Sequence, residues 1–405
     1  MVSDTEDLPR GPASRPVFAA ILATTGAALP AFLLGGVAVQ VRADLGFSEG
    51  RLGLLVTVYF ALSAFASTTA GRLTERLGVR RAMVIVAVIA ALSLTGMAIA
   101  PSWWFLLLAI AVGAGSNAFA QPASNLLLAR AVDRARQGFA FGLKQGAVPL
   151  TSLLGGLAVP VFALTVGWRW AFATGALLAL SLILIVPRKV PIPTFPKANP
   201  ATRFAVPALR EGARRPLTLL AVAAFFGNFG SNALGVFLVE HVVQAGSPEA
   251  FGGTMLMLGS VFGIISRVSL GRWADRSARP VFFATASLML FGGGLGYLLL
   301  ASGRSALLVP ALILTFGAGW GWNGLFSYSV VTSHREAPAA ATGIAQSGLF
   351  LGAMAGPGVF GVVVERVGFP TAWTMLAVSM VVASTLMLVG SRRIRLVDDT
   401  PPRTD

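Results

Sequence analysis

The sequence predicts an all-α integral membrane protein with twelve transmembrane helices, arranged as two pseudo-symmetric bundles of six helices each. Three observations carry this prediction. The 405 residues are 55% hydrophobic and 12% charged, with a mean hydropathy of +0.77, which is more apolar than a soluble chain needs. Apolar runs of roughly 20 residues, each long enough to cross a bilayer, recur along the chain. The second half also repeats features of the first half at a nearly constant spacing.

The apolar runs come in two sets of six. Unpaired backbone polar groups are costly in lipid, so each run must be a helix or a strand of a closed barrel. Barrel strands alternate polar and apolar residues over about ten positions, whereas these runs are apolar on all sides, so helices are favoured. The expected spans are 17–41, 52–70, 82–100, 104–129, 139–166 and 168–186, followed by 217–240, 252–270, 281–301, 307–332, 339–364 and 371–389.

The repeat is clearest in two short segments. Residues 71–76, Gly-Arg-Leu-Thr-Glu-Arg, are echoed by residues 271–276, Gly-Arg-Trp-Ala-Asp-Arg. At the same spacing Gly35 matches Gly235, Gln40 matches Glu240, Glu49 matches Glu249 and Gly53 matches Gly253. At a spacing one residue longer, Gly142 matches Gly343 and Gln145 matches Gln346. Repeats of a multi-helix unit are typical of secondary transporters.

These features divide the chain into five parts. We expect an N-terminal tail at 1–16, a first bundle at 17–187, a linker at 188–216, a second bundle at 217–390 and a C-terminal tail at 391–405. The linker is rich in proline and in basic residues, which predicts a polar, extended and solvated connection.

The net charge of +15 follows the topology. Basic residues gather in the two tails, the linker and the loops on the same side of the predicted bundles. Those expected on the opposite side are Arg42, Arg51, Arg169, Arg304 and Arg366. This positive-inside bias predicts a protein of the plasma (inner) membrane with both termini in the cytoplasm. Because the topology accounts for the excess of basic residues, we expect no nucleic-acid partner.

Several classes of chemistry are excluded. The chain has no cysteine, so disulfides and thiolate metal sites are excluded. Its two histidines, His241 and His334, fall at predicted helix ends, and no Gly-x-x-x-x-Gly-Lys-Ser/Thr loop occurs. We therefore expect no enzyme activity, metal, cofactor or ATP-driven step, and a monomer whose partners are the bilayer and a small-molecule substrate.

Residues 71–81 lie between the second and third spans and resemble the signature loop of the major facilitator superfamily. The resemblance covers nearly the whole chain through helix count, linker and repeat. It implies two bundles that rock about a central site, and a cytoplasmic latch near the start of the eleventh span. The residues it assigns to this gating motif are Gly71, Glu75, Arg76 and Arg130, with Gly271, Asp275 and Arg276 in the second copy.

Two signatures of proton-coupled drug exporters in this family are missing. The fourth span has Ala109 where those exporters carry Arg, and residues 146–149, Gly-Ala-Val-Pro, lack the adjacent Gly-Pro. These departures weaken the exporter interpretation without excluding it.

The family fold also implies that the first, fourth, seventh and tenth spans enclose the path. Polar residues on three of these spans have helical spacing, which places each set on one face. An unpaired amide in lipid is costly, so these faces should point inward, as interhelical contacts or as ligand contacts. The predicted substrate residues of this kind are Asn117, Gln121, Asn228, Asn232, Trp320 and Asn323, together with the repeat pair Gln145 and Gln346.

Two cations fall within predicted spans, Lys144 in the fifth and Arg267 in the eighth, and no acidic residue lies at a similar depth. Intramembrane charges are costly and usually functional, so an anionic substrate is the simplest partner. Arg267 before Gly271 also resembles the helix-eight Arg of monocarboxylate and oxalate–formate carriers, although Ala345 stands where oxalate carriers have Lys. Alternatively, both side chains extend to the cytoplasmic surface.

The resulting expectation is a secondary active transporter that works by alternating access and carries a small organic anion such as a carboxylate. The alternative is a proton-coupled exporter of a hydrophobic drug or metabolite. A receptor with a carrier fold is a third possibility.

Overall fold

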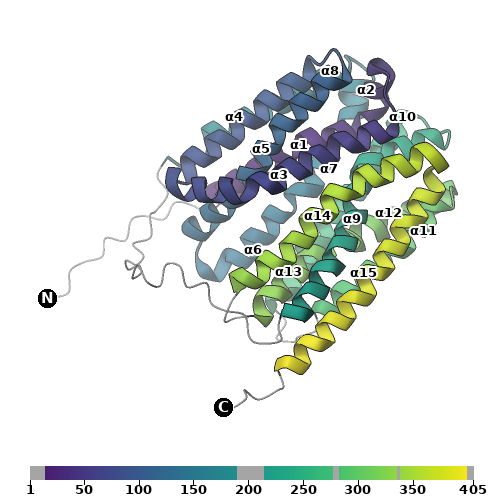
Figure 1. The fold of residues 1–405 in the computed structure, drawn as a ribbon. Coiled ribbons are helices and arrows are strands. Elements are labelled where there is room, and N and C mark those ends of the chain that lie inside the picture. The colour runs from purple at the N-terminus through teal and green to yellow at the C-terminus, as the bar shows by residue number, and fades with distance from the viewer. Residues whose placement is uncertain (1–13, 189–213, 277–281, 335–337, 399–405) are drawn as a thin grey trace, which may run out of the picture.

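The computed structural model describes residues 14–188, 214–276, 282–334 and 338–398 (Figure 1). Within these ranges twelve helical segments are long and apolar enough to span a membrane, and the described chain contains no strand. The twelve-helix, all-α prediction is therefore confirmed.

The first bundle contains six spans. Five are single helices, and the remaining one, fifth in chain order, consists of consecutive short helices. The bounds are α1 (Ser14–Gly36), α3 (Glu49–Leu77), α4 (Val79–Ala98), α5 (Trp103–Ala131), the interrupted span α6 (Arg134–Gln145), α7 (Ala147–Ala158) and η1 (Val159–Ala163), and finally α8 (Trp168–Ile185). A short helix, α2 (Ala38–Leu45), joins α1 to α3 and begins within the predicted first span, so that span ends earlier than expected.

The second bundle has the same plan, again with one interrupted span. Its helices are α9 (Arg214–Gln244), α10 (Glu249–Arg276), α11 (Phe282–Ala301), the interrupted span η2 (Ser305–Leu307), α12 (Leu308–Leu312), η3 (Ile313–Ala318) and α13 (Trp322–Ser333), then α14 (Pro338–Val367) and α15 (Phe369–Asp398). α15 continues beyond the apolar run that predicted it, because a helix pairs its own backbone groups in water as well as in lipid.

The bundles pack on each other through α1 with α9, α3 with α14, and α10 with the interrupted span α6, α7 and η1, and α2 also contacts α9. The closest approaches between backbones of opposite bundles lie at the end remote from the starts of α1 and α9, which we call the closed end. There, a Cβ on Gly53 would lie 2.2 Å from the carbonyl oxygen of Pro357, and Gly156 and Gly253 meet backbone to backbone. Glycine at these positions lets helices of opposite bundles approach closely.

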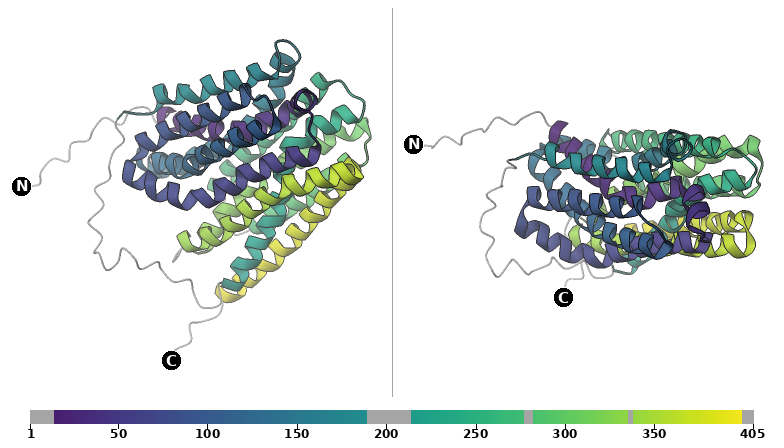
Figure 2. Two further views of the ribbon diagram at one scale, coloured as in Figure 1. Left: turned by 45° about the horizontal axis from the view of Figure 1, so that its top comes forward. Right: turned by 90° about the horizontal axis from the view of Figure 1, so that it is seen from above.

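The other end of the molecule, which we call the terminal end, carries the starts of α1 and α9 and the end of α15. Between the two ends α3 and α14 separate, as two views show (Figures 1 and 2). Near the terminal end neither Gly71 on α3 nor Gly343 on α14 has a neighbouring atom within 4 Å of a notional Cβ. The bundles are therefore joined at the closed end and diverge along this pair of helices.

Candidate functional site

Lys144 lies in the last turn of α6 and is buried, with 1% of its surface exposed. Its Nζ donates hydrogen bonds to Gln121 Oε1, at 2.6 Å, and to Asn125 Oδ1, at 2.7 Å, both on α5. These partners are neutral, and no carboxylate of the described chain forms an ion pair with Lys144. The positive charge that this amine carries when protonated is therefore not balanced by an acidic side chain among the described residues. Asn125 itself is exposed, so this cluster reaches an open surface.

Arg267 on α10 binds backbone carbonyls of both bundles. Its Nη1 donates to the carbonyl of Gln145, at 2.6 Å, and its Nη2 and Nε donate to the carbonyl of Trp320, at 3.0 and 3.3 Å. The guanidinium also lies 5.7 Å from the centre of the Trp320 ring. It therefore does not extend to the surface in the way that the alternative interpretation proposed.

Both carbonyls lie at interruptions of a helix. In an unbroken helix the carbonyl of Gln145 would accept from the residue four positions later, but that residue is Pro149, which has no N–H. The carbonyl of Trp320 lies in the turn between η3 and α13. Arg267 thus supplies donors where the backbone lacks them and joins the two bundles. This role of Arg267 was not predicted from the sequence, although Pro149, four residues after Gln145, indicates that the Gln145 carbonyl lacks a helical donor.

The predicted amides divide into two groups. Asn228 donates to the carbonyl of Leu349 on α14, at 2.6 Å, and Asn232 donates to the carbonyl of Asn228, at 3.1 Å. These two side chains therefore hold α9 to α14 and to itself. The others are partly exposed, and they are Asn117 and Gln121 on α5, Gln145 on α6, Asn323 on α13 and Gln346 on α14.

An aromatic contact closes the site toward the closed end. Trp320 is 3% exposed, and its ring meets Phe32 of α1 edge to face, with centroids 5.8 Å apart. Phe316 packs against the other side of Trp320, at 5.2 Å. Trp322, in contrast, is fully buried within the second bundle and packs against Phe326. Trp320 therefore lies between the bundles, whereas Trp322 belongs to the core.

The signature loop is unengaged at the terminal end. Glu75 and Arg76 are exposed, and within the described chain Glu75 and Arg130 form no ion pair with each other. The Nε of Arg130 is buried and has no hydrogen-bond partner. Gly271 lies near the end of α10, and Arg276 is its last residue. The side chain of Asp275 lies outside the described residues. Because α3 and α14 diverge here, the described residues show no ion pair between this loop and α14 in this conformation.

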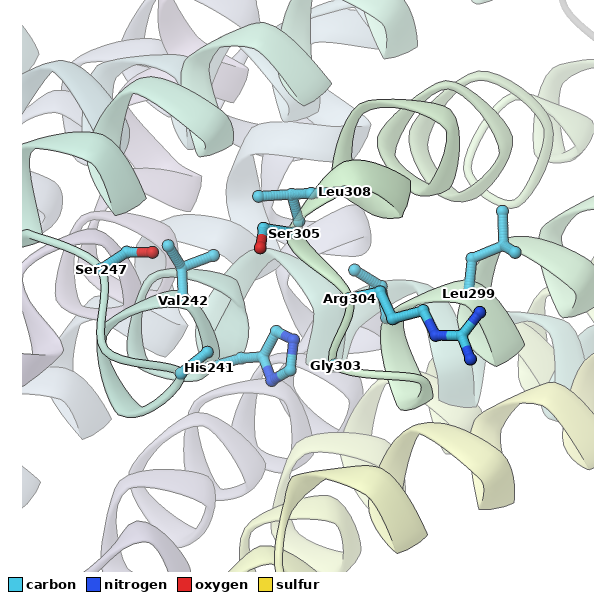
Figure 3. A pocket seen from close by; sticks show the side chains of 10 residues that line it. His241, Val242, Ser247, Leu299, Gly303, Arg304, Ser305 and Leu308 are labelled. Atoms are coloured by element: carbon cyan, nitrogen blue, oxygen red, sulfur yellow. The ribbon is translucent and has the colours of Figure 1, made fainter.

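A separate pocket lies at the closed end of the second bundle (Figure 3). His241, Ser247, Arg304 and Ser305 line it, and the His241 ring packs against Trp373. It is distant in sequence and in the fold from the cluster around Lys144. We therefore do not include it in the candidate site.

The sequence profile of the Major Facilitator Superfamily matches residues 18–345, which is most of the chain. The chain belongs to this family. Members of the family are membrane transporters, so the protein is a transporter and not an enzyme.

Relatives within the superfamily are distant. A probable sugar efflux transporter of Mannheimia succiniciproducens is 26% identical over 264 residues, which cover 63% of this chain and 62% of that protein. The purine ribonucleoside efflux pump NepI of Salmonella paratyphi B is 25% identical over 341 residues, which cover 80% of this chain and 82% of that protein. The match thus spans less than two thirds of the first relative and more of the second.

A solved structure confirms the major facilitator fold. It is a bacterial homologue of the human lysosomal transporter Spinster, described as inward-facing and unoccupied. The likeness has a TM-score of 0.64 with 16% identity, and it covers 95% of this chain and 96% of that chain.

Proposed function

We propose that this major facilitator exports a small organic metabolite that carries a negative charge, by alternating access of its two bundles. The terminal end would face the cytoplasm of the plasma (inner) membrane, as the distribution of basic residues predicts. The protein would act as a monomer, and substrate would enter from the terminal end.

The environment of Lys144 is the observation that supports an anionic substrate. Two amide oxygens accept hydrogen bonds from its ammonium, but neither can balance its charge. An ammonium has three donors, so one is available for a substrate carboxylate or phosphate. A buried charge without a counter-ion is costly, and an anion bound beside Lys144 would offset that cost.

The other predicted residues have supporting roles in this proposal. Asn117, Gln121, Asn323 and Gln346 would supply hydrogen bonds to the polar part of the substrate, and Trp320 would form its apolar wall. Arg267 would hold the broken helices in position and would not grip the anion, because its donors already serve two carbonyls.

Export is supported by the names of two relatives, one a probable sugar efflux transporter and the other a purine ribonucleoside efflux pump. These names also favour a second candidate, export of an uncharged polar metabolite. Amides beside an aromatic wall, as at Asn323 and Trp320, suit a sugar or a nucleoside as well as an acid. The hydrophobic-drug alternative has less support, because the candidate site is rich in amides.

Substrate counterflow in proteoliposomes tests the proposal. Labelled mono- and dicarboxylates, a purine nucleoside and a hexose would be compared, with a cationic dye as a further control. Accumulation of a carboxylate supports the anionic substrate, and accumulation of the nucleoside or hexose alone supports the second candidate. Accumulation of the dye alone would establish the drug exporter instead.

The variant Lys144→Gln makes the test specific. We expect it to lower the apparent affinity for the anion by at least about tenfold, which corresponds to the loss of one charge-assisted hydrogen bond. Lys144→Arg retains the charge and is the matched control, so it should lose less. Equal anion affinity in wild type and Lys144→Gln would contradict the proposed role.

A further inference from the structure

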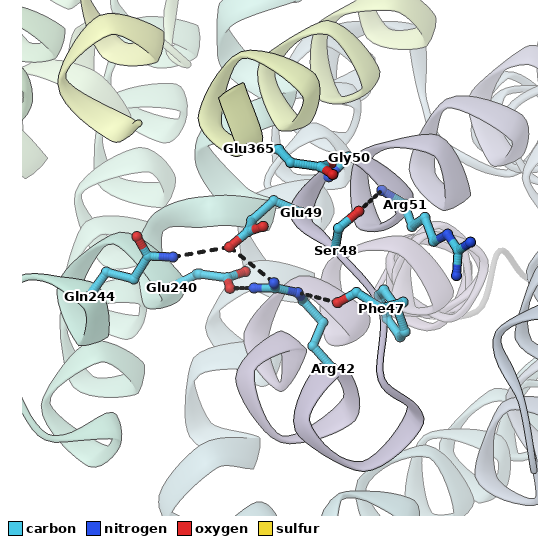
Figure 4. A network of polar contacts seen from close by, with 9 residues as sticks. All are labelled: Arg42, Phe47, Ser48, Glu49, Gly50, Arg51, Glu240, Gln244 and Glu365. Atoms are coloured by element: carbon cyan, nitrogen blue, oxygen red, sulfur yellow. Dashed lines mark hydrogen bonds and ion pairs between the residues drawn. The ribbon is translucent and has the colours of Figure 1, made fainter. Parts of the chain in front are cut away.

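Arg42 and Glu240 form an ion pair that crosses between the bundles at the closed end (Figure 4). Arg42 lies on α2 and Glu240 lies on α9. The same guanidinium contacts Glu49 of α3, at 3.0 Å, and donates to the carbonyl of Phe47, at 3.0 Å. One cation therefore serves two carboxylates, one from its own bundle and one from the other bundle.

Glu240 depends on this single partner. Its side chain is 4% exposed, one carboxylate oxygen contacts Arg42, and the other oxygen is buried without a hydrogen bond. Glu49 has a second partner, because Gln244 of α9 also donates a hydrogen bond to it, at 3.1 Å. A buried carboxylate is stable as an anion only while its charge is compensated.

The internal repeat shows why this contact is unusual. Gln40 and Glu240 occupy equivalent positions in the two halves, as do Glu49 and Glu249. On one side of the interface Gln40 donates directly to Glu249, at 2.5 Å. The symmetry-related contact would place Glu240 against Glu49, two carboxylates that repel each other unless a cation or a proton lies between them. Arg42 supplies that cation in the closed arrangement.

Opening of the closed end separates the partners unequally. Arg42 and the acid Glu49 move together because they belong to the same bundle, so Arg42 keeps a counter-ion. Glu240 leaves with the second bundle and loses the one group that balances its charge. Without the ion pair, protonation of Glu240 costs less than it does in the closed state.

We propose that Glu240 is a proton-binding site whose occupancy is linked to opening of the closed end: it is ionised and bound to Arg42 when this end is closed, and it binds a proton more readily when this end is open. The inference rests on the proposed transport function and names the proton as the coupling ion. It is carried by the ion-pair geometry and the buried, unpartnered oxygen. For an exporter, a proton taken up at this end would accompany release of the substrate.

Other charged groups surround this site and must be separated from it. Glu249 of α10 accepts from Gln40, and Glu365 of α14 accepts from the backbone N–H of Gly50, at 3.0 Å. His241, next to Glu240 on α9, packs against Phe369 and Trp373. Arg304 lines the pocket beside His241. Among these described groups, Glu240 alone is a carboxylate that has a cation of the other bundle as its ion-pair partner.

The test measures opening directly. The chain has no native cysteine, so spin labels at Ala43→Cys and Ala245→Cys, both exposed, report the distance between the bundles at the closed end. The open state binds one more proton than the closed state. The ratio of open to closed molecules should therefore rise as the pH falls, by up to tenfold per pH unit for one linked proton.

Three variants give opposite or matched outcomes. In Glu240→Gln the ratio should change less than about twofold over the same pH range, because the linked group is gone. Arg42→Gln leaves Glu240 and Glu49 facing each other in the closed state, so protonation should then favour closing and the pH dependence should reverse. Glu365→Gln removes a carboxylate that joins the bundles without a cation, and it should behave like wild type.

A wild-type distance that is independent of pH would overturn the inference, and so would an unchanged pH dependence in Glu240→Gln. If Glu240→Gln does not fold, the reversal in Arg42→Gln decides the question alone. The labelling needs no substrate, so it is independent of the counterflow assay. Carboxylate counterflow without pH-linked opening would reject the proton site and leave the proposed function intact. Opening that depends on pH through Glu240, without carboxylate counterflow, would reject the substrate class alone.

Discussion

At the scale of single residues, Arg267 shows how a charge can be accommodated in a membrane protein without an acid. Backbone carbonyls at helix interruptions are strong acceptors that lack an intrahelical donor. Pro149 creates one such acceptor at Gln145, and Arg267 of the opposite bundle occupies it. The charge that suggested an anion site therefore has a structural role in this conformation.

This role leads to a stability prediction. Arg267→Gln removes hydrogen bonds to two carbonyls and should lower the free energy of unfolding by about 1.5–3 kcal/mol, the range for one charge-assisted bond. Thermal unfolding of the purified protein in detergent measures the change. Arg272→Gln is the matched control, because Arg272 on the same helix is exposed and contacts only the Phe139 ring among described partners. Equal melting temperatures for the two variants would contradict the role.

At the scale of elements, the contact between α3 and α14 depends on glycine at one end of α3 and not at the other. A Cβ on Gly53 would lie 2.2 Å from the carbonyl oxygen of Pro357, whereas a Cβ on Gly71 would meet no atom within 4 Å. Both glycines lie on the same helix, which makes them a natural pair for comparison.

We predict that Gly53→Val prevents close packing at the closed end and that Gly71→Val does not. The clash in Gly53→Val involves backbone atoms, so it is relieved only when the bundles move apart. The spin-label distance from position 43 to position 245 would report the opening. Indistinguishable distances in the two variants would show that the contact tolerates a side chain.

The signature loop gives a second prediction at this scale. Glu75 has no ion-pair partner among the described residues, so the latch role that the family resemblance predicts for it would belong to the opposite conformation, in which the terminal end is closed. Glu75→Gln should therefore leave the melting temperature unchanged and slow turnover by about tenfold or more, through loss of a charge-assisted contact. Asp275→Asn should slow it less, because the second loop matches the motif less well. Wild-type counterflow rates in Glu75→Gln would refute the latch.

At the scale of the whole molecule, the two ends differ in both charge and packing. The closed end contains the ion pair between Arg42 and Glu240 that joins the bundles, and the terminal end carries the start of α1, the end of α15 and the basic residues around the turn between α3 and α4. The positive-inside rule predicts that the terminal end is cytoplasmic.

Single cysteines test this orientation. Ser14→Cys, at the start of α1, should react only with a thiol reagent that reaches the cytoplasmic side, and Ala245→Cys should react with an impermeant reagent added outside. Both positions are exposed, so differences in reactivity report the side of the membrane. Labelling of Ser14→Cys from outside would reverse the assigned topology and the direction of the proposed proton site.

The sequence by itself determined the architecture. Helix number and the twofold plan follow from local properties, namely apolar runs of bilayer length and the repeat of residues 71–76 at 271–276. The interruptions of the fifth and tenth spans were not predicted, because π-helical turns at Val159 and Ile313 leave the hydropathy of a run unchanged.

Only the tertiary structure decided what each polar residue contacts. Lys144 and Arg267 look alike in the sequence, as isolated cations in apolar runs, yet one binds neutral amides and the other binds carbonyls of two bundles. Asn228 and Gln121 each belong to a set of polar residues with helical spacing. Asn228 donates to a carbonyl of α14 and so holds α9 to α14, whereas Gln121 accepts from Lys144. The pairing of Arg42 with Glu240 joins residues far apart in the chain and in different bundles. Such contacts depend on how the bundles are docked, which no local pattern of residues encodes.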